Sequence, residues 1–348
     1  MRITYVLPRP ELGGGNKVIF QHARLLQENG AEVTVLCEGP KPDWIAIDAA
    51  YVDSTAGFPK LPEQDLVIAT YWTTLPVARR LGLGPLAHFC QGYEGGLVHL
   101  RPVLQEIEAV YSWRLPTLTV APHLGELLRE RFGRESRVVP PPLDPLFRPA
   151  LRLGPRRRPW IAIPGIFEAE VKGIPTALAA VRRLRESGVA CRVLRFSVLP
   201  LSREERSLLE PDRYLCGVPP RDIATVLRAC DLLFLPSYPE EGFGLPLLEA
   251  MASKVPAVAS RIPSTVHLTG GAVPLVPPGD AAAFAEAARE LLSSAGAWRR
   301  ARERGFEAAR RFRPEGVAPL LVEAVRWARQ LPQDTPLTLA SLSLEDAT

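Results

Sequence analysis

Short apolar runs and longer amphipathic stretches alternate along the chain. Residues 2–7 form a mainly apolar run, residues 16–29 repeat apolar side chains at helical spacing, and residues 32–37 are apolar again. The short runs predict buried strands and the stretch between them predicts a helix, with Gly30 in the position of its C-cap. Because two strands joined by a helix lie parallel in one sheet, this opening predicts an α/β fold.

The same alternation continues through the chain in two series. The first series predicts further strands and helices at residues 65–71, 73–81, 86–90, 117–121, 124–132 and 137–139. The second predicts them at residues 160–164, 175–187, 191–196, 213–218, 221–229, 232–236, 246–253, 255–259, 281–292, 298–312 and 315–330. Seven prolines between residues 140 and 159 mark a linker between the series. We therefore predict domains at residues 1–150 and 151–312, a final helix at 313–330 and a loose tail at 331–348.

The most informative stretch, residues 231–259, predicts a strand, a glycine-containing loop, a helix and a second strand. Amides in the first turn of a helix have no intrahelical acceptor, and the helix dipole adds positive potential there, so the junction favours an anion. The amides in question are those of Phe243, Gly244 and Leu245. Glu241 and Glu249 flank them, and a carboxylate accepts hydrogen bonds from sugar hydroxyls. Amides for phosphate and carboxylates for hydroxyls together predict a nucleotide-sugar site.

The spacing of these two glutamates resembles the signature of the family-4 retaining glycosyltransferases, the glycosyl transferases group 1. The resemblance rests on Glu241, seven intervening residues and Glu249, with Gly-Phe-Gly between them and Pro-x-Val-Ala after them. It implies the GT-B fold, in which two doubly wound Rossmann-like domains face a central cleft and the last helix crosses back to the first domain. It also implies that Glu241 contacts the transferred sugar and Glu249 the ribose hydroxyls. As isolated residues, both would be read as exposed charges beside an amphipathic helix.

Two loops of the first domain are candidates for the other side of the cleft. Gly13–Gly15 is neither a Walker loop nor a good dinucleotide fingerprint, because no Gly-Lys-Ser/Thr follows and position 18 is valine. It is either a tight turn or a loop in which Gly14 and Gly15 present amides to the donor phosphate or the acceptor, as the resemblance implies. Glu94 lies in a loop that faces the acceptor in related enzymes, and is a candidate catalytic group. His88 is expected to be a core residue.

The second domain contributes two further positions through the resemblance. Lys172 matches a family lysine that holds the diphosphate, but the arginine that normally accompanies it is replaced by isoleucine or phenylalanine at 166 or 167. The residues that could supply the missing charge are Arg195, Arg221 and Arg261. Gly217 ends a strand whose backbone is expected to contact the nucleobase.

Composition narrows the classes of function. A net charge of +4 does not by itself indicate nucleic acid, and no apolar run is long enough to span a membrane. The chain enters a strand without a signal peptide, so a cytoplasmic protein is expected. Five scattered cysteines indicate core residues rather than a metal site. The arginine-rich residues 298–312 are consistent with weak peripheral membrane association, although interspersed glutamates favour a solvated face.

The resemblance implies retaining transfer of a hexosyl group from a nucleoside-diphosphate sugar to a hydroxyl of a glycan, polysaccharide or lipid-linked acceptor. No Asp-x-Asp motif stands where a metal-dependent transferase needs one, so we expect no metal and no cofactor. Lys172 and the amides near Gly244 would stabilise the leaving diphosphate. Two alternatives stay open: a non-catalytic GT-B subunit, which the missing arginine supports, and a nucleotide-sugar epimerase. The broken glycine fingerprint disfavours a dehydrogenase.

Overall fold

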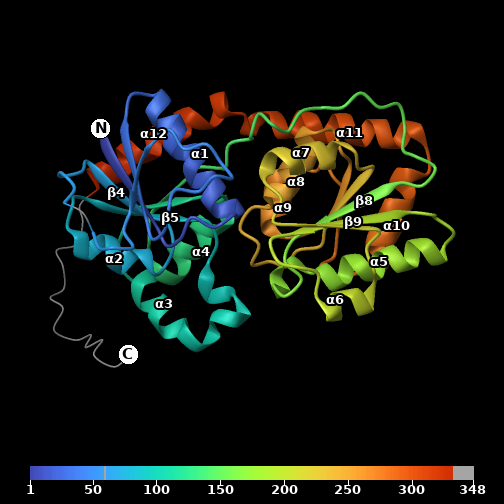
Figure 1. Cartoon of the computed structure of the whole chain (residues 1–348), viewed down its shortest axis with the longest axis horizontal. Helices are drawn as coiled ribbons and strands as arrows, with labels where there is room; N and C mark the ends of the chain where they lie inside the picture. The colour runs from blue at the N-terminus through green and yellow to red at the C-terminus, as the bar shows by residue number, and fades with distance from the viewer. Residues whose placement is uncertain (59, 332–348) are drawn as a thin grey trace.

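The computed structural model describes residues 1–58 and 60–331, and it contains two parallel β-sheets side by side (Figure 1). One sheet has seven strands in the order β3-β2-β1-β4-β5-β6-β7, and the other has six in the order β10-β9-β8-β11-β12-β13. Each order runs outward from a central strand in both directions, which is the arrangement of doubly wound sheets. The prediction of a doubly wound α/β fold is confirmed. Of the predicted tail at residues 331–348, residues 332–348 lie outside the described residues.

The first sheet is made of β1 (Arg2–Leu7), β2 (Glu32–Cys37), β3 (Ala50–Asp53), β4 (Leu66–Ala69), β5 (Leu86–Cys90), β6 (Thr117–Thr119) and β7 (Ser136–Val138). Its helices are α1 (Gly14–Glu28), α2 (Thr74–Leu81), α3 (Leu104–Tyr111) and α4 (Pro122–Phe132), with 3₁₀ turns η1 (Glu94–Gly96) and η2 (Val98–Val103). Together with the last helix, α12 (Pro314–Gln330), these elements are called the N-terminal domain below.

The second sheet is made of β8 (Trp160–Pro164), β9 (Arg192–Ser197), β10 (Arg213–Cys216), β11 (Leu232–Leu235), β12 (Ala257–Ser260) and β13 (Leu275–Val276). Its helices are α5 (Ile174–Glu186), α6 (Arg203–Leu208), α7 (Pro220–Arg228), α8 (Leu245–Ala252), α9 (Pro263–Thr269), α10 (Ala281–Leu292) and α11 (Ala295–Ala309), with 3₁₀ turns η3 (Glu170–Lys172) and η4 (Arg310–Phe312). Residues 160–313 are called the C-terminal domain below.

The central strand β11 shows how the C-terminal domain packs its core. Successive strand side chains point to opposite faces of a sheet. Leu232 and Phe234 belong to the cluster that contains α5 and α10, whereas Leu233 and Leu235 pack with α7 and α8. The second of these clusters continues into the core of the N-terminal domain. Helices therefore cover both faces of this sheet, and one face shares a hydrophobic core with the other domain.

The last helix joins the two domains a second time. α12 packs on α1, β4, β5 and β7 of the first sheet, although it follows the C-terminal domain in the chain (Figure 1). It buries one face, formed by Val317, Leu321, Ala324, Val325 and Ala328. Where α12 leaves the C-terminal domain, it lies next to the linker, and the amide of Leu143 donates to the carbonyl of Phe312 at 2.6 Å. The chain thus crosses between the domains twice, once in the linker and once at the start of α12, and the two crossings lie side by side.

Several short elements were not predicted. These are β3, β13, α3, α6 and α9, together with the 3₁₀ turns. β3 is half exposed, with no strict alternation, and β13 has only two residues. α6 and α9 have six and seven residues, too few for a clear helical period. These elements were missed because they are short or partly exposed and so leave no clear period in the sequence. Their sequence patterns do not contradict the observed structure.

Candidate functional site

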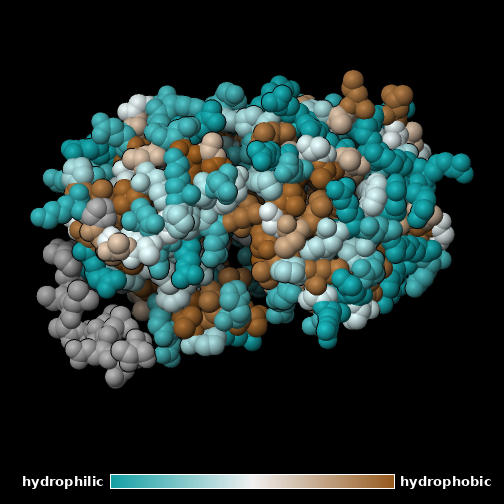
Figure 2. Space-filling view, in the orientation of Figure 1, coloured by the Kyte–Doolittle hydropathy of each residue, from teal (hydrophilic) through white to brown (hydrophobic). Residues whose placement is uncertain are grey.

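A cavity of about 400 Å³ lies between the two domains. Its walls are the loops that follow β1, β5, β8, β9 and β11, each at the carboxyl end of its strand. In the space-filling view the surface is hollowed between the two halves, and apolar residues line part of the hollow (Figure 2). Crevices at this edge of doubly wound sheets are the usual place for a ligand. The cavity is therefore the candidate site.

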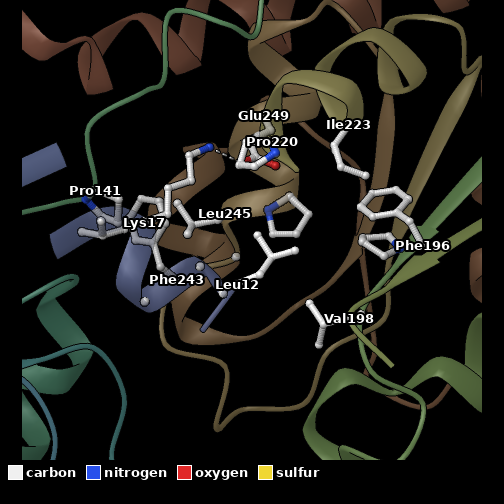
Figure 3. A pocket seen from close by; sticks show the side chains of 18 of the residues that line it. Leu12, Lys17, Pro141, Phe196, Val198, Pro220, Ile223, Phe243, Leu245 and Glu249 are labelled. Carbon is white, nitrogen blue, oxygen red and sulfur yellow. Dashed lines mark hydrogen bonds and ion pairs between the residues drawn. The ribbon is translucent and has the colours of Figure 1, made fainter. Parts of the chain in front are cut away.

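Four charged residues line this cavity, and they form two ion pairs. Lys172 Nζ lies 2.7 Å from Glu241 Oε2, and Lys17 Nζ lies 2.8 Å from Glu249 Oε1. The first pair lies within the C-terminal domain. The second joins α1 of the N-terminal domain to α8 of the other (Figure 3). The walls thus carry two cations and two carboxylates, and their formal charges cancel.

The loop that carries Lys172 is held tightly against the loop that carries Glu241. Gly173 has φ 59°, and a Cβ at this position would lie 2.1 Å from the carbonyl oxygen of Pro236. The amide of Tyr238 donates to the carbonyl of Val171 at 2.8 Å. Glu241 also accepts a hydrogen bond from Ser237 Oγ at 2.9 Å. These contacts fix the lysine and the carboxylate at one place in the cavity wall.

The first turn of α8 faces the same cavity. Gly244 is its N-cap with φ 91°, and the Gly244 carbonyl accepts hydrogen bonds from the first amides inside the helix. Within residues 1–58 and 60–331, the amides of Phe243, Gly244 and Leu245 have no hydrogen-bond acceptor. Glu249 lies one turn further along α8 and points toward the cavity (Figure 3). The predicted combination of free amides and a nearby carboxylate is present.

Gly14 and Gly15 bring the start of α1 to the opposite wall. A Cβ on Gly14 would lie 2.9 Å from Leu245 Cδ1, and one on Gly15 would lie 3.2 Å from Gln91 Nε2. Gly242 approaches the other domain even more closely, since its Cβ would lie 1.8 Å from the carbonyl oxygen of Gln91. Gly242 thus meets the backbone of the N-terminal domain where no side chain would fit, whereas Gly14 and Gly15 face the ends of side chains.

One end of the cavity is apolar. Phe196 of β9 and Val198, which follows this strand, lie on the same side of the cavity as Ile223 of α7, and Leu12 approaches from the N-terminal domain (Figure 3). Pro220 completes this end of the wall. The apolar end offers a surface for a flat, weakly polar group.

Two predicted site residues do not line this cavity. The Glu94 side chain is buried and accepts a hydrogen bond from the Tyr111 hydroxyl. Burial raises the pKa of Glu94 to about 7. Gly217, with φ 61°, instead lines a second cavity of about 980 Å³, which is bordered by the linker and shares Pro220 with the first. The other eight predicted residues lie at the first cavity.

None of the three arginines considered as a replacement lines the first cavity. The buried Arg195 guanidinium donates to the carbonyls of Ile163 and Gly165 and pairs with Glu205, so it braces the sheet. Arg221 borders the second cavity, and Arg261 donates to a main-chain carbonyl. The sequence analysis missed Lys17, the cation that does lie there. One signal was available, because a lysine in the first turn of a helix opposes the helix dipole and so needs a partner.

The remaining expectations concern histidine, cysteine, metal and membrane. His88 is buried, as expected for a core residue, and its Nδ1 lies 3.0 Å from Arg134. All five cysteines are free, and four are buried, whereas Cys216 is exposed. Within the described ranges no three potential ligands cluster as a metal site would require. No helix in those ranges combines the length and apolarity of a membrane span.

Comparison with known proteins shows which proteins this chain is similar to. Residues 158–294 match the family model "Glycosyl transferases group 1". The chain is 31% identical over 169 residues to a phosphatidyl-myo-inositol mannosyltransferase of Mycobacterium leprae, covering 47% of this chain and 45% of that protein. It is 34% identical over 115 residues to the O-antigen chain mannosyltransferase B of Escherichia coli, covering 33% of this chain and 30% of that protein. The matches thus span less than half the length of these relatives.

Solved structures are similar over nearly the whole chain. Sucrose-phosphate synthase from Thermosynechococcus elongatus superimposes with a TM-score of 0.76 at 19% identity, covering 94% of this chain and 98% of that one. The Anabaena protein HepE, solved with UDP and glucose, gives 0.74 at 15% identity, covering 94% and 100%. Over nearly its whole length the chain therefore has the GT-B fold, and through residues 158–294 it resembles the glycosyl transferases group 1, as the spacing of Glu241 and Glu249 predicted.

Proposed function

We propose that this protein is a glycosyltransferase that moves a hexosyl group from a nucleoside-diphosphate sugar to an acceptor hydroxyl, with retention of configuration. The observation that carries the proposal is the wall formed by Glu241, Lys172, Glu249 and the free amides at the start of α8. It lies inside the stretch that matches the family model. The two curated relatives described above are named as mannosyltransferases, which supports transfer of a sugar rather than binding alone.

The cavity offers a matching surface to each part of such a donor. The base fits the apolar end beside Phe196, and its ribose hydroxyls reach Glu249. The diphosphate lies at the first turn of α8 within reach of Lys172, and the sugar lies against Glu241. Because a nucleotide-sugar combines an apolar base, hydroxyls and a dianion, it uses every kind of group that the cavity presents.

The residues also suit the chemistry of transfer. The bond between the anomeric carbon and the diphosphate oxygen breaks, and its electron pair stays on the diphosphate. Lys172 and the α8 amides stabilise the charge that develops there. The acceptor oxygen forms the new bond to the anomeric carbon, and its proton passes to the departing phosphate. Glu241 orients the sugar. Glu94 takes no part in this proposal, because its buried carboxyl is bonded to Tyr111.

Thermal unfolding with UDP, GDP, dTDP or ADP tests the donor site. A nucleotide at 100 times its dissociation constant should stabilise the protein by about 2.7 kcal/mol. We expect one base to give the largest shift, the shift to persist with EDTA, and Glu249→Ala to abolish it. The control is Glu307→Ala, an exposed glutamate on α11. No shift with any nucleotide would overturn the proposal, and a shift that EDTA removes would overturn its metal independence.

Turnover separates the proposal from its alternatives. With the sugar donors of the selected base and a panel of glycan and lipid-linked acceptors, we expect release of nucleoside diphosphate that depends on an acceptor. Glu241→Gln should lower kcat while leaving nucleotide binding intact. Binding without turnover would favour the non-catalytic subunit. Conversion of the donor's sugar without an acceptor would favour the epimerase.

A further inference from the structure

Lys17 is the one charged residue that the N-terminal domain brings to the cavity wall, among the residues the structure describes. It lies in the first turn of α1 and its side chain is only 6% exposed. Its ammonium group lies 2.8 Å from Glu249 Oε1 and 3.2 Å from Asp144 Oδ2. The Phe147 ring centroid lies 4.6 Å from it on a further side. Two segments, residues 144–147 and α8, thus converge on this cation from distant parts of the sequence.

This position is unfavourable for a lysine by itself. Burial lowers the pKa of Lys17, and the positive end of α1 also opposes its charge. Glu249 and Asp144 outweigh burial and raise the pKa above its ordinary value, so the group is an ammonium ion. Burial in turn raises the pKa of Glu249, which the facing ammonium opposes. Two carboxylates, Glu249 and Asp144, therefore keep this buried lysine in its charged form in the cavity wall.

The hydrogen-bonding capacity of this lysine exceeds its present use. An ammonium group has three N–H donors, and the described residues supply it with two acceptors, Glu249 and Asp144. In the proposed function the ribose hydroxyls donate to Glu249. Lys17 then keeps Asp144 and has two donors left for another anion. The diphosphate is the anion that arrives with the ribose.

The charge balance of the site points the same way. With both ion pairs intact the wall is neutral, while a nucleoside diphosphate brings at least two negative charges. The arginine position beside Lys172 holds Ile166 or Phe167, and Arg195 is committed inside the sheet. Lys17 is the remaining buried cation at this cavity within the described residues.

We propose, on the basis of the function proposed above, that Lys17 binds the donor diphosphate and replaces the arginine missing from the C-terminal domain. The donor site is then completed by a residue of the N-terminal domain. Glu249 releases Lys17 when ribose binds, and the phosphate receives it.

Calorimetry on the full chain tests this assignment against a purely structural role. Lys17→Gln keeps a hydrogen-bond donor for Glu249 but removes the charge, and Lys17→Met removes both. The control is Lys254→Met, because Lys254 pairs with Glu303 away from the cavity. Each variant is titrated with the nucleoside diphosphate that the thermal screen selects and with the nucleoside of the same base.

We expect Lys17→Gln to weaken diphosphate binding about tenfold or more, as for loss of a charged hydrogen bond, and to change nucleoside binding less than about twofold. Lys17→Arg should restore most of the diphosphate affinity. If Lys17 only holds Glu249 in place, both ligands weaken equally in the methionine variant, and the assignment is wrong. Unchanged diphosphate binding would also refute it and leave the proposed function standing. Absence of nucleotide binding by the wild type would overturn both.

Discussion

Gly242 is the point where the loop before α8 meets the N-terminal domain. A Cβ at this position would lie 1.8 Å from the carbonyl oxygen of Gln91 and 2.9 Å from its carbonyl carbon. Ordinary contact begins at 3.4 Å, so an alanine requires the two loops to move apart by about 1.6 Å. Both contacting atoms are backbone atoms, so no side-chain rotation relieves the clash. The change should therefore open the cavity between the domains.

We expect Gly242→Ala to lower kcat/KM about 100-fold, because a displacement of about 1 Å between reacting groups can cost that much. This corresponds to about 2.7 kcal/mol of transition-state stabilisation. The free energy of unfolding should change by less than about 1 kcal/mol. Gly242 has no positive φ that alanine would have to copy, and the contact lies outside the core of either domain.

The assay combines initial rates of nucleoside diphosphate release with urea unfolding and small-angle scattering. The scattering measures the separation of the domains without depending on the identity of the acceptor. Gly92→Ala is the matched control, because it lies in the facing loop and its added Cβ would meet nothing within 4 Å. Wild-type kcat/KM and compactness in Gly242→Ala would refute the reasoning. So would an equal loss in the control.

Three further predictions concern stability. The pKa of Glu94 is raised from 4.5 to about 7, so its contribution is complete below about pH 4.5 and is lost as the pH rises through 7. The stability of wild type relative to Glu94→Gln should therefore fall by about 3 kcal/mol between pH 4.5 and 8 in urea titrations, and a flat difference would contradict this. Asp231→Ala leaves two arginines without a buried carboxylate partner and should lower the free energy of unfolding by about 3 kcal/mol. Asp222→Ala, at an exposed aspartate, should lower it by less than about 0.5 kcal/mol. Equal losses would show that burial is not the cause. Gly173→Ala forces φ 59° on alanine against a facing carbonyl and should lower the free energy of unfolding by about 2 kcal/mol, and an unchanged midpoint would mean that this loop relaxes freely.

The sequence predicted the fold well where burial leaves a periodic pattern. β11 is buried on both faces and reads as a continuous apolar run, and α12 repeats its buried residues at helical spacing. β3 lies at the sheet edge with half-exposed side chains, so its pattern does not differ from that of a loop. Prediction therefore failed where packing against one neighbour, rather than periodicity, defines the element.

The candidate site was also predicted only in part, where local spacing in the sequence defines it. Glu241 and Glu249 lie eight residues apart on one loop and helix, so local spacing found them. Lys17 meets Glu249 across 232 positions of sequence and two domains, and no local pattern connects them. Glu94 was a candidate because its loop faces the acceptor in related enzymes. Tyr111, seventeen residues later, covers it instead. Covering by a distant element is decided by tertiary packing.

The return of α12 to the first sheet sets an order of events during synthesis. The face of the N-terminal domain that α12 covers is apolar, and its partners on the helix are almost fully buried. About 175 residues separate β7 from α12, which at about 5 to 20 residues per second is an interval of about 10 to 35 seconds. Residues 160–313 form a continuous segment and can fold on leaving the ribosome. The part of the protein that is made first is therefore completed last, and its apolar face stays uncovered until α12 has been made.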